Sequence, residues 1–171
     1  MSNDKNSLFT NQEIIALYKI VREHQEELPA TETEIHFDYY DDYEELVGKN
    51  VLRAILKKLS KKLPKEEKDS LDKEFLRKKY SSFNNEIDER VYSVLERAFS
   101  HLKTVEISYF NIENAEFSKR KIDIYYKSRR YIIGYCHLRK SIRKFRTSRI
   151  ASAKLTKNKY QIREDFNKNN Y

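Results

Sequence analysis

The stretch RYIIGYCHLRKSIRKFRTSRI, residues 130–150, is the part of the chain that decides how the fold is interpreted. It holds seven Lys or Arg residues and no acid, with aromatic and aliphatic residues between the charges. Protein surfaces usually mix both signs of charge, and an all-positive surface is typical of proteins with an anionic partner. The stretch therefore combines the pattern of packed strands with that of a basic binding surface.

The charge of the whole chain is divided unevenly. Residues 118–171 hold 17 Lys or Arg and 3 Asp or Glu, a net of +14, and residues 1–117 hold 18 and 24, a net of −6. The two values sum to the formal net charge of +8. This asymmetry indicates a basic module whose natural partners are polyanions, the alternative being a basic surface that is merely solvated.

The composition is that of a folded protein of the cytoplasm. Of its 171 residues 13% are aromatic, and the chain has two Gly, two Pro and one Cys. A single thiol excludes an intramolecular disulfide framework and a multi-thiolate zinc site. The polar N-terminal residues do not resemble a signal peptide, and no apolar run approaches the length that crosses a bilayer. We expect a cytoplasmic protein with no membrane partner.

Four segments carry the apolar periodicity of amphipathic helices. The first, residues 11–28, places apolar side chains on one face at Ile14, Leu17, Tyr18 and Val21, and Thr10 or Asn11 can cap it. The other three are residues 49–63, 65–80 and 84–103. The N-terminal part of the chain is therefore predicted to be helical.

Residues 30–47, between the first two predicted helices, contain seven acids, four aromatic residues and no Lys or Arg. We interpret this segment as an acidic loop that leads into the next helix. The alternative is a segment that covers a basic surface, either in the same chain or across a homodimer.

The periodicity changes after His101, where short alternating segments begin. Val105, Ile107 and Tyr109 form one side of the first, and Ile122, Ile124 and Tyr126 form one side of the second. YIIGYC, ASAKLT and KYQIR are further strand candidates, and residues 111–119 are predicted to be a hairpin loop. We therefore expect an α+β protein, with a helical region at residues 1–103 and a small antiparallel β-barrel or sandwich at residues 104–171.

Several kinds of chemistry find no support in the sequence. The four His residues have no paired metal-ligand spacing, and two glycines are too few for a phosphate-binding glycine-rich loop. Cys136 and His137 are neighbours whose side chains would point to opposite faces of a strand, so Cys136 is interpreted as a small buried hydrophobic residue. We expect no metal, no cofactor, no catalytic residue and no enzymatic activity.

The arginines of the opening stretch recur at Arg139, Arg143, Arg146 and Arg149. A guanidinium group can bind phosphate or carboxylate through two parallel hydrogen bonds and can also stack on a base. The rings among them could stack on unpaired bases or fill the core. We interpret Tyr131, Ile133, Tyr135 and Phe145 as packing residues and the arginines as one anion-binding face.

These residues together resemble the WYL domain family. The residues that carry the resemblance are, in chain order, Arg120, Arg130-Tyr131-Ile132, Tyr135-Cys136, Arg139, Arg143, Phe145-Arg146 and Arg149-Ile150. It covers about residues 103–163. The chain departs from the family pattern at Arg130, where the name-giving Trp would stand, and at Ile124, where the family often has Pro.

The resemblance implies an Sm/SH3-like five-stranded antiparallel β-barrel, found in bacterial regulators that sense ligands and bind nucleic acid. In such regulators the domain commonly follows a winged helix-turn-helix, which is not recognisable ahead of residues 11–28. Residues 1–103 then resemble the helical connector of the family, and the chain resembles a shortened member or a fragment.

The leading functional hypothesis is a regulatory protein that binds single-stranded DNA or RNA, or a nucleotide-like ligand, and so controls transcription or a defence system. The candidate ligand-binding residues are Arg120, Tyr131, His137, Arg139, Arg143, Phe145, Arg146 and Arg149. The alternative is an interaction module in which residues 30–47 dock on the basic barrel, as in a homodimer. Duplex binding by the N-terminal helices ranks last because those helices carry net negative charge.

Overall fold

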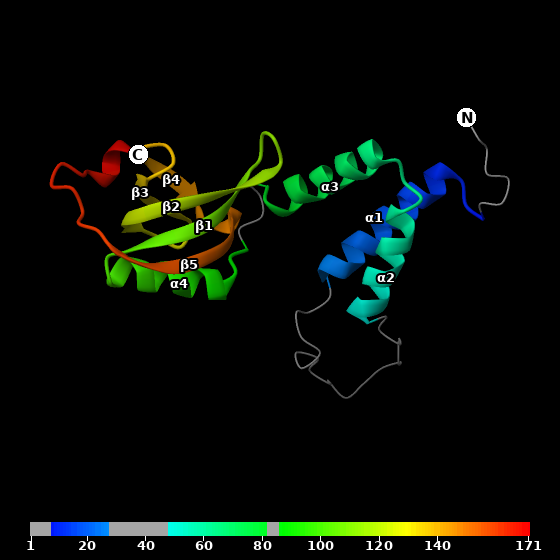
Figure 1. The fold of residues 1–171 in the computed structure, drawn as a ribbon, viewed down its shortest axis with the longest axis horizontal. Coiled ribbons are helices and arrows are strands. Elements are labelled where there is room, and N and C mark those ends of the chain that lie inside the picture. The colour runs from blue at the N-terminus through cyan, green and yellow to red at the C-terminus, as the bar shows by residue number, and fades with distance from the viewer. Residues whose placement is uncertain (1–7, 28–47, 82–85) are drawn as a thin grey trace. The chain divides into compact units, whose positions relative to one another are not determined.

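The structure is a computed structural model that describes residues 8–27, 48–81 and 86–171. The chain divides into two compact units, residues 1–72 and residues 73–171, and each is considered by itself (Figure 1). The predicted boundary at residues 103 and 104 remains a prediction. The helix that ends just before this boundary packs against the strands that follow it, so packing groups that helix with the sheet.

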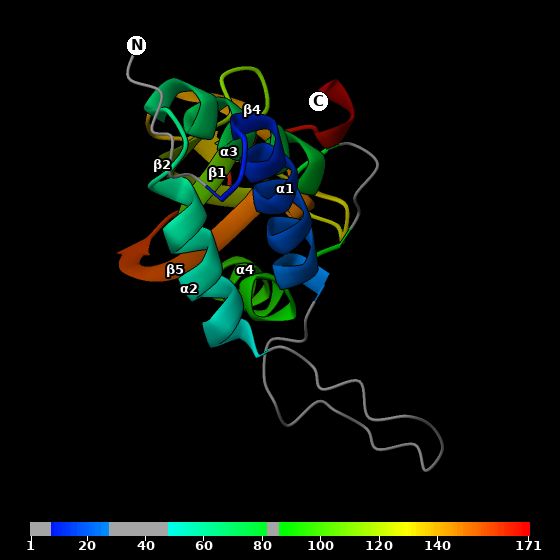
Figure 2. The same ribbon diagram turned by 90° about the vertical axis from the view of Figure 1, so that its right-hand side faces the viewer.

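The first unit is helical, as the apolar periodicity predicts. α1 (Asn11–Glu27) and α2 (Lys49–Ser60) lie side by side, and α3 (Lys65–Lys79) follows and continues into the second unit (Figures 1 and 2). The buried side chains that join α1 to α2 are Ile14, Tyr18, Leu52 and Leu56. The segment with seven acids, residues 30–47, lies outside the described residues.

Thr10 caps α1 through a reciprocal pair of hydrogen bonds with Glu13. The Glu13 carboxylate accepts from the Thr10 backbone N–H at 2.7 Å, and the Thr10 hydroxyl oxygen accepts from the Glu13 N–H at 3.3 Å. These bonds satisfy backbone donors that have no partner within the helix. The hydrogen bond from the Thr10 backbone lowers the pKa of Glu13 below its usual value.

The second unit contains a five-stranded antiparallel sheet, which confirms the α+β class. Its strands are β1 (Lys103–Asn111), β2 (Glu116–Lys127), β3 (Tyr131–Cys136), β4 (Ser141–Arg146) and β5 (Ile150–Lys159), in the order β4-β3-β2-β1-β5. One strand was missed and one strand prediction is wrong. Residues 141–146 form a strand that the alternation did not indicate, and KYQIR lies almost wholly beyond the last strand.

The sheet curls strongly without closing by strand pairing. The Tyr109 ring of β1 meets the Phe145 ring of β4 edge to face at 5.2 Å between centroids, although β2 and β3 lie between them in the sheet. The Tyr109 hydroxyl oxygen accepts from the Arg146 backbone N–H at 3.3 Å. Within the described residues no pairing joins β4 to β5, and the 3-10 turn η2 (Thr147–Arg149) connects them.

One face of the sheet, which we call the helix face, packs against α4 (Glu89–Ser100). Leu95 and Ala98 of α4 are fully buried against Val105, Ile122 and Ile124 of the strands. Asp88 caps α4 by accepting from the backbone N–H groups of residues 90 and 91. The opposite side is called the open face.

A shift in strand register reverses the prediction for Tyr126. Ile124 pairs with Gly134 but Tyr126 pairs with Ile133, so residues 124 and 126 lie on opposite faces. Side chains that pair directly across strands share a face. Tyr126 therefore belongs to the open face, whereas the sequence pattern placed it with Ile122 and Ile124.

The packing prediction for the opening stretch is right for Phe145 and Ile133, which are buried, whereas Tyr131 and Tyr135 are half-buried. Phe145 is 1% exposed and lies in the core of the helix face. In β3 that core receives Ile132 and Cys136, whereas Tyr131, Ile133 and Tyr135 point to the open face. Ile133 is nevertheless buried, so the open face also has covered parts.

No helix in the described part of the chain is long and apolar enough to cross a membrane.

Candidate anion-binding site

Arg120 lies inside the curl of the sheet, on the helix face opposite Ile107. Its Cζ atom is 5.3 Å from the centroid of the Tyr109 ring and 5.7 Å from that of Phe145. Its Nε donates to the Ser118 hydroxyl at 3.0 Å. The two rings and the hydroxyl thus hold one edge of the guanidinium group, and no hydrogen bond from its terminal nitrogens occurs among the described residues.

No acid in the described part of the chain forms an ion pair with Arg120. None of the ion pairs between described residues involves Arg120, Arg139 or Arg143. Arg139 and Arg143 are exposed, and Arg143 lies on the helix face, paired with Gly134. A set of unneutralised guanidinium groups is typical of a surface that binds phosphate or carboxylate.

The turn η2 adds Arg149 to this part of the molecule. The Nε of Arg149 and the Oγ1 of Thr147 are buried and meet no hydrogen-bond partner among the described residues. Buried polar atoms are usually satisfied. η2 contacts β1 and β3, so the Arg149 donor belongs to the same end of the curled sheet as Tyr109.

Asp123 is the one acid between residues 118 and 163, and its carboxylate contacts two neighbouring side chains. It is 7% exposed, and it accepts from the Thr104 hydroxyl at 2.6 Å and contacts His137 Nε2 at 2.9 Å. The buried carboxylate therefore fixes the orientation of the half-exposed imidazole ring. The exposed part of the His137 ring lies on the open face.

A shallow hollow of about 310 Å³ lies beside His137. It is lined by Glu106, Lys119, Arg120, Lys121, His137 and Leu138. The lining is mostly basic with one carboxylate, and it includes two of the candidate residues, Arg120 and His137, whose side chains lie on opposite faces of the sheet.

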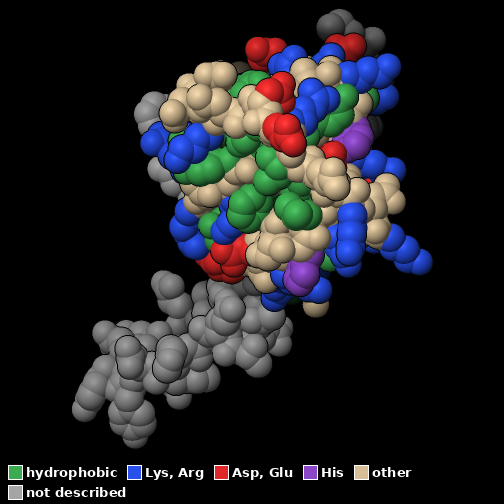
Figure 3. Space-filling model, turned by 90° about the vertical axis from the view of Figure 1, so that its left-hand side faces the viewer, with side chains coloured by type: hydrophobic (Ala, Val, Ile, Leu, Met, Phe, Trp, Pro, Cys, Tyr) green, Lys and Arg blue, Asp and Glu red, His purple; other side chains and the backbone are tan. Residues whose placement is uncertain are grey.

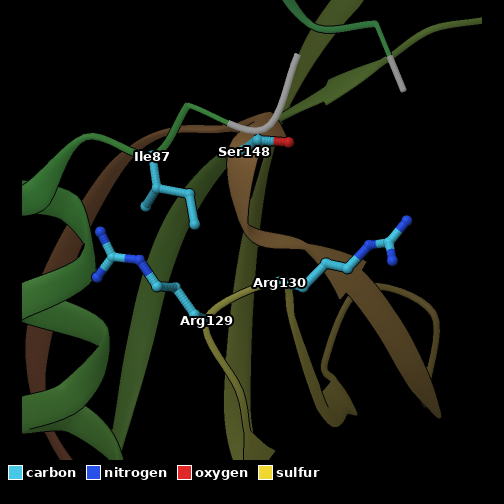
Figure 4. Close-up of a pocket in the computed structure, with 4 residues that line it drawn as sticks. All are labelled: Ile87, Arg129, Arg130 and Ser148. Atoms are coloured by element: carbon cyan, nitrogen blue, oxygen red, sulfur yellow. The ribbon is translucent and has the colours of Figure 1, made fainter. Parts of the chain in front are cut away.

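A second hollow of about 370 Å³ is lined by Ile87, Arg129, Arg130 and Ser148 (Figure 4). The side chains of Arg129 and Arg130 point away from each other, and Arg129 pairs with Glu89 of α4. The two guanidinium groups do not converge on one anion. Arg130, at the usual Trp position, reaches outward from this hollow.

The structure divides the eight candidate residues among four places. Arg120, Arg143 and Phe145 belong to the helix face, and Tyr131, His137 and Arg146 to the open face. Arg139 lies in the turn between β3 and β4, and Arg149 lies in η2. Because Phe145 is buried, it supports Arg120 from below and offers no free ring face to a base.

Sequence reasoning missed Tyr109 and Ser118, which hold Arg120. It also missed Asp123, which holds His137, and Thr104, which donates to Asp123. Tyr109 could have been found, since it alternates with Ile107 on the side of the strand that faces the core. The contacts with Asp123 depend on strand register, which the sequence does not reveal. No group of three or more potential metal ligands occurs among the residues that the structure describes.

The fold and this arrangement of arginines agree with a match to a known family. Residues 90–155 match the family model described as the WYL domain, so the chain carries a WYL domain. The matched range begins in α4 and ends in β5, and it contains all eight candidate residues.

One solved structure similar to this chain is proteasome accessory factor B/C (PafBC) of Arthrobacter aurescens. The identity is 17% and the TM-score 0.37, and the alignment covers 88% of this chain and 21% of that one. This chain thus spans about a fifth of the length of that protein. Among curated proteins no sequence matches significantly.

Proposed function

We propose that this protein is a WYL-type regulator whose sheet unit binds single-stranded nucleic acid or a nucleotide-like anion. Arg120 and Arg143 bind phosphate groups, with Arg139, Arg146 and Arg149 around them, and His137 and the ring of Tyr131 contact the ligand from the open face. Binding of this ligand then controls transcription or a defence system.

The observation that carries the proposal is the setting of Arg120. Its guanidinium group is held over two aromatic rings with no carboxylate partner among described residues, and its planar fork matches a phosphate group. Self-repulsion makes such a concentration of positive charge unfavourable unless an anion neutralises it.

Fluorescence anisotropy with labelled oligothymidylate and oligouridylate tests the proposal. We expect binding to weaken as salt rises, because phosphate contacts release counterions, with a slope near 0.7 per contact on a double logarithmic plot. Arg120→Ala with Arg143→Ala removes two such contacts, so the affinity should fall roughly tenfold or more and the slope by about 1.4.

Lys157→Ala is the matched control, because Lys157 is an exposed cation of β5 outside the candidate set. Its affinity should stay within about twofold of the parent protein, as expected for one distant surface charge. Competition with mononucleotides separates a nucleotide ligand from a strand. Absence of binding to every oligonucleotide and nucleotide at low salt contradicts the proposal.

A further inference from the structure

Three tyrosines form a row on the open face of the sheet. Tyr126 of β2 and Tyr131 and Tyr135 of β3 share this face by strand register, and each is half-buried. The ring centroids of Tyr126 and Tyr131 are 6.4 Å apart. Rows of aromatic rings on basic sheets are surfaces on which successive unpaired bases stack.

A cation already lies over each of these rings. Arg163 lies 4.8 Å from the centroid of Tyr135, Lys168 lies 5.2 Å from that of Tyr126, and Lys144 of β4 lies 4.2 Å from that of Tyr131. Two of the three cations come from the segment after β5, residues 160–171. One face of each ring is therefore covered by a cation of the chain itself.

Side chains attach the segment 160–171 to the sheet. The Tyr160 hydroxyl donates to the Ile124 carbonyl, at the position where the register of β2 shifts. The Phe166 ring meets Tyr125 edge to face at 5.3 Å, and Lys144 Nζ donates to the Tyr171 backbone oxygen at 3.0 Å. Phe166 is the central anchor between these two ends.

The backbone of the segment makes few bonds to the sheet unit. Its first residue donates to Leu102, and the two backbone bonds described beyond it, from Phe166 to Arg163 and from Asn170 to Asn167, stay within the segment. Apart from Tyr160 and Phe166 the segment is exposed. Segments with few buried contacts open at a low free-energy cost.

The segment carries two acids beside its two bases, Arg163 and Lys168. Glu164 and Asp165 are two of the three acids in residues 118–171, and both are exposed. On the side of the unit where this segment lies, hydrophobic side chains gather near the centre, with Lys and Arg along much of the edge and some Asp or Glu between them (Figure 3). The segment thus places carboxylates on a surface that otherwise attracts phosphates.

We propose that the tyrosine row is a stacking surface for the bases of a single strand and that segment 160–171 covers Tyr126 and Tyr135 until a strand displaces it. The segment then lowers the apparent affinity, because only the fraction of molecules with an open row is competent to bind. This inference rests on the proposed function. It adds to the arginine site a second contact surface, whose accessibility depends on segment 160–171.

Phe166→Ala tests the displacement, because it removes the central anchor and leaves all three tyrosines and all arginines in place. We expect the affinity for labelled oligothymidylate and oligouridylate to rise roughly three- to tenfold, as the competent fraction grows. Adding Tyr135→Ala to Phe166→Ala should cancel most of the gain. Ile162→Ala is the matched control within the segment, since Ile162 is 39% exposed, and its affinity should equal that of the parent protein.

Tryptic cleavage of the unaltered protein gives a second measurement that needs no variant. Cleavage after Arg163 and Lys168 should accelerate when the oligonucleotide is added, because the segment leaves the sheet. Slower cleavage means that the segment forms part of the bound complex and overturns the inference.

The outcomes for the two proposals differ. If the parent protein binds through Arg120 and Arg143 while Phe166→Ala binds equally or more weakly, the proposed function stands and the displacement is wrong. If Phe166→Ala binds an oligonucleotide and the parent protein does not, both proposals are supported. If neither protein binds any oligonucleotide, the proposed function fails and the tyrosine row has no nucleic-acid role.

Discussion

Gly134 lies where two strands approach too closely for any side chain. A Cβ atom built at this position would lie 2.2 Å from the backbone oxygen of Asp123. We expect Gly134→Ala to destabilise the sheet unit by about 3 kcal/mol or more, since backbone must move to relieve the overlap. Urea unfolding followed by circular dichroism measures the loss.

Gly48 provides the matched comparison for this prediction. It precedes α2, and an added Cβ meets nothing within 4 Å. Gly48→Ala should therefore cost less than about 1 kcal/mol, the usual range for a changed N-cap residue. Equal losses for the two variants would contradict the close approach at Gly134.

Tyr18 makes the helical unit sensitive to alkaline pH. Burial, and then the hydrogen bond to Asp72 at 2.7 Å, raise the pKa of Tyr18 from 10.0 to about 12. A raised pKa means that stability is fully present below pH 10 and is lost as the pH rises toward about 12. Burial also raises the pKa of Tyr125 and of Tyr160. Tyrosinate absorbance should therefore show several late-titrating groups, of which Tyr18→Phe removes one, and a titration unchanged by Tyr18→Phe would contradict this.

At the residue scale, the sequence shows which residues are candidates for the site better than it shows which face of the sheet each side chain takes. The absence of acids around the arginines is a local property, so Arg120 and Arg143 could be selected without a structure. Their separation from Tyr131 and His137 could not, because strand register decides which face each side chain takes. The shift at Tyr125 shows this, since it moves Tyr126 to the face opposite Ile124.

At the scale of elements, α4 begins with a cap that can be tested. The Asp88 carboxylate accepts from the N–H of Arg90 at 2.8 Å and of Val91 at 3.3 Å. Asp88→Ala should cost about 1 kcal/mol of stability because it leaves these donors without a partner, whereas Asp88→Ser should retain most of the cap. Thermal unfolding of both variants provides the measurement, and equal losses would show that the cap contributes little.

The helices were predicted well because their apolar spacing is periodic, whereas one strand was missed and another misplaced. In β4 the apolar residues Ile142 and Phe145 lie on opposite faces, so no alternation marks it as a strand. In KYQIR the apolar Tyr160 and Ile162 do alternate, yet Tyr160 bonds to the Ile124 carbonyl and the chain leaves the sheet. Contacts between distant segments decided both cases, and no local pattern encodes them.

At the scale of the whole molecule, the division into two compact units predicts that damage to one spares the other. Leu56 is 8% exposed and packs in the helical unit, so Leu56→Ala should destabilise that unit by about 2–5 kcal/mol through the lost burial and the cavity. Amide hydrogen exchange should accelerate in α1 and α2 while β1, β2 and β3 keep their protection, because units with separate cores open separately. Ile122→Ala in the sheet core is the reciprocal test and should accelerate exchange in the strands but not in α1. Uniform acceleration across both units, from either variant, would mean that the chain unfolds as one cooperative body, and the sheet unit would then need the helices for its stability.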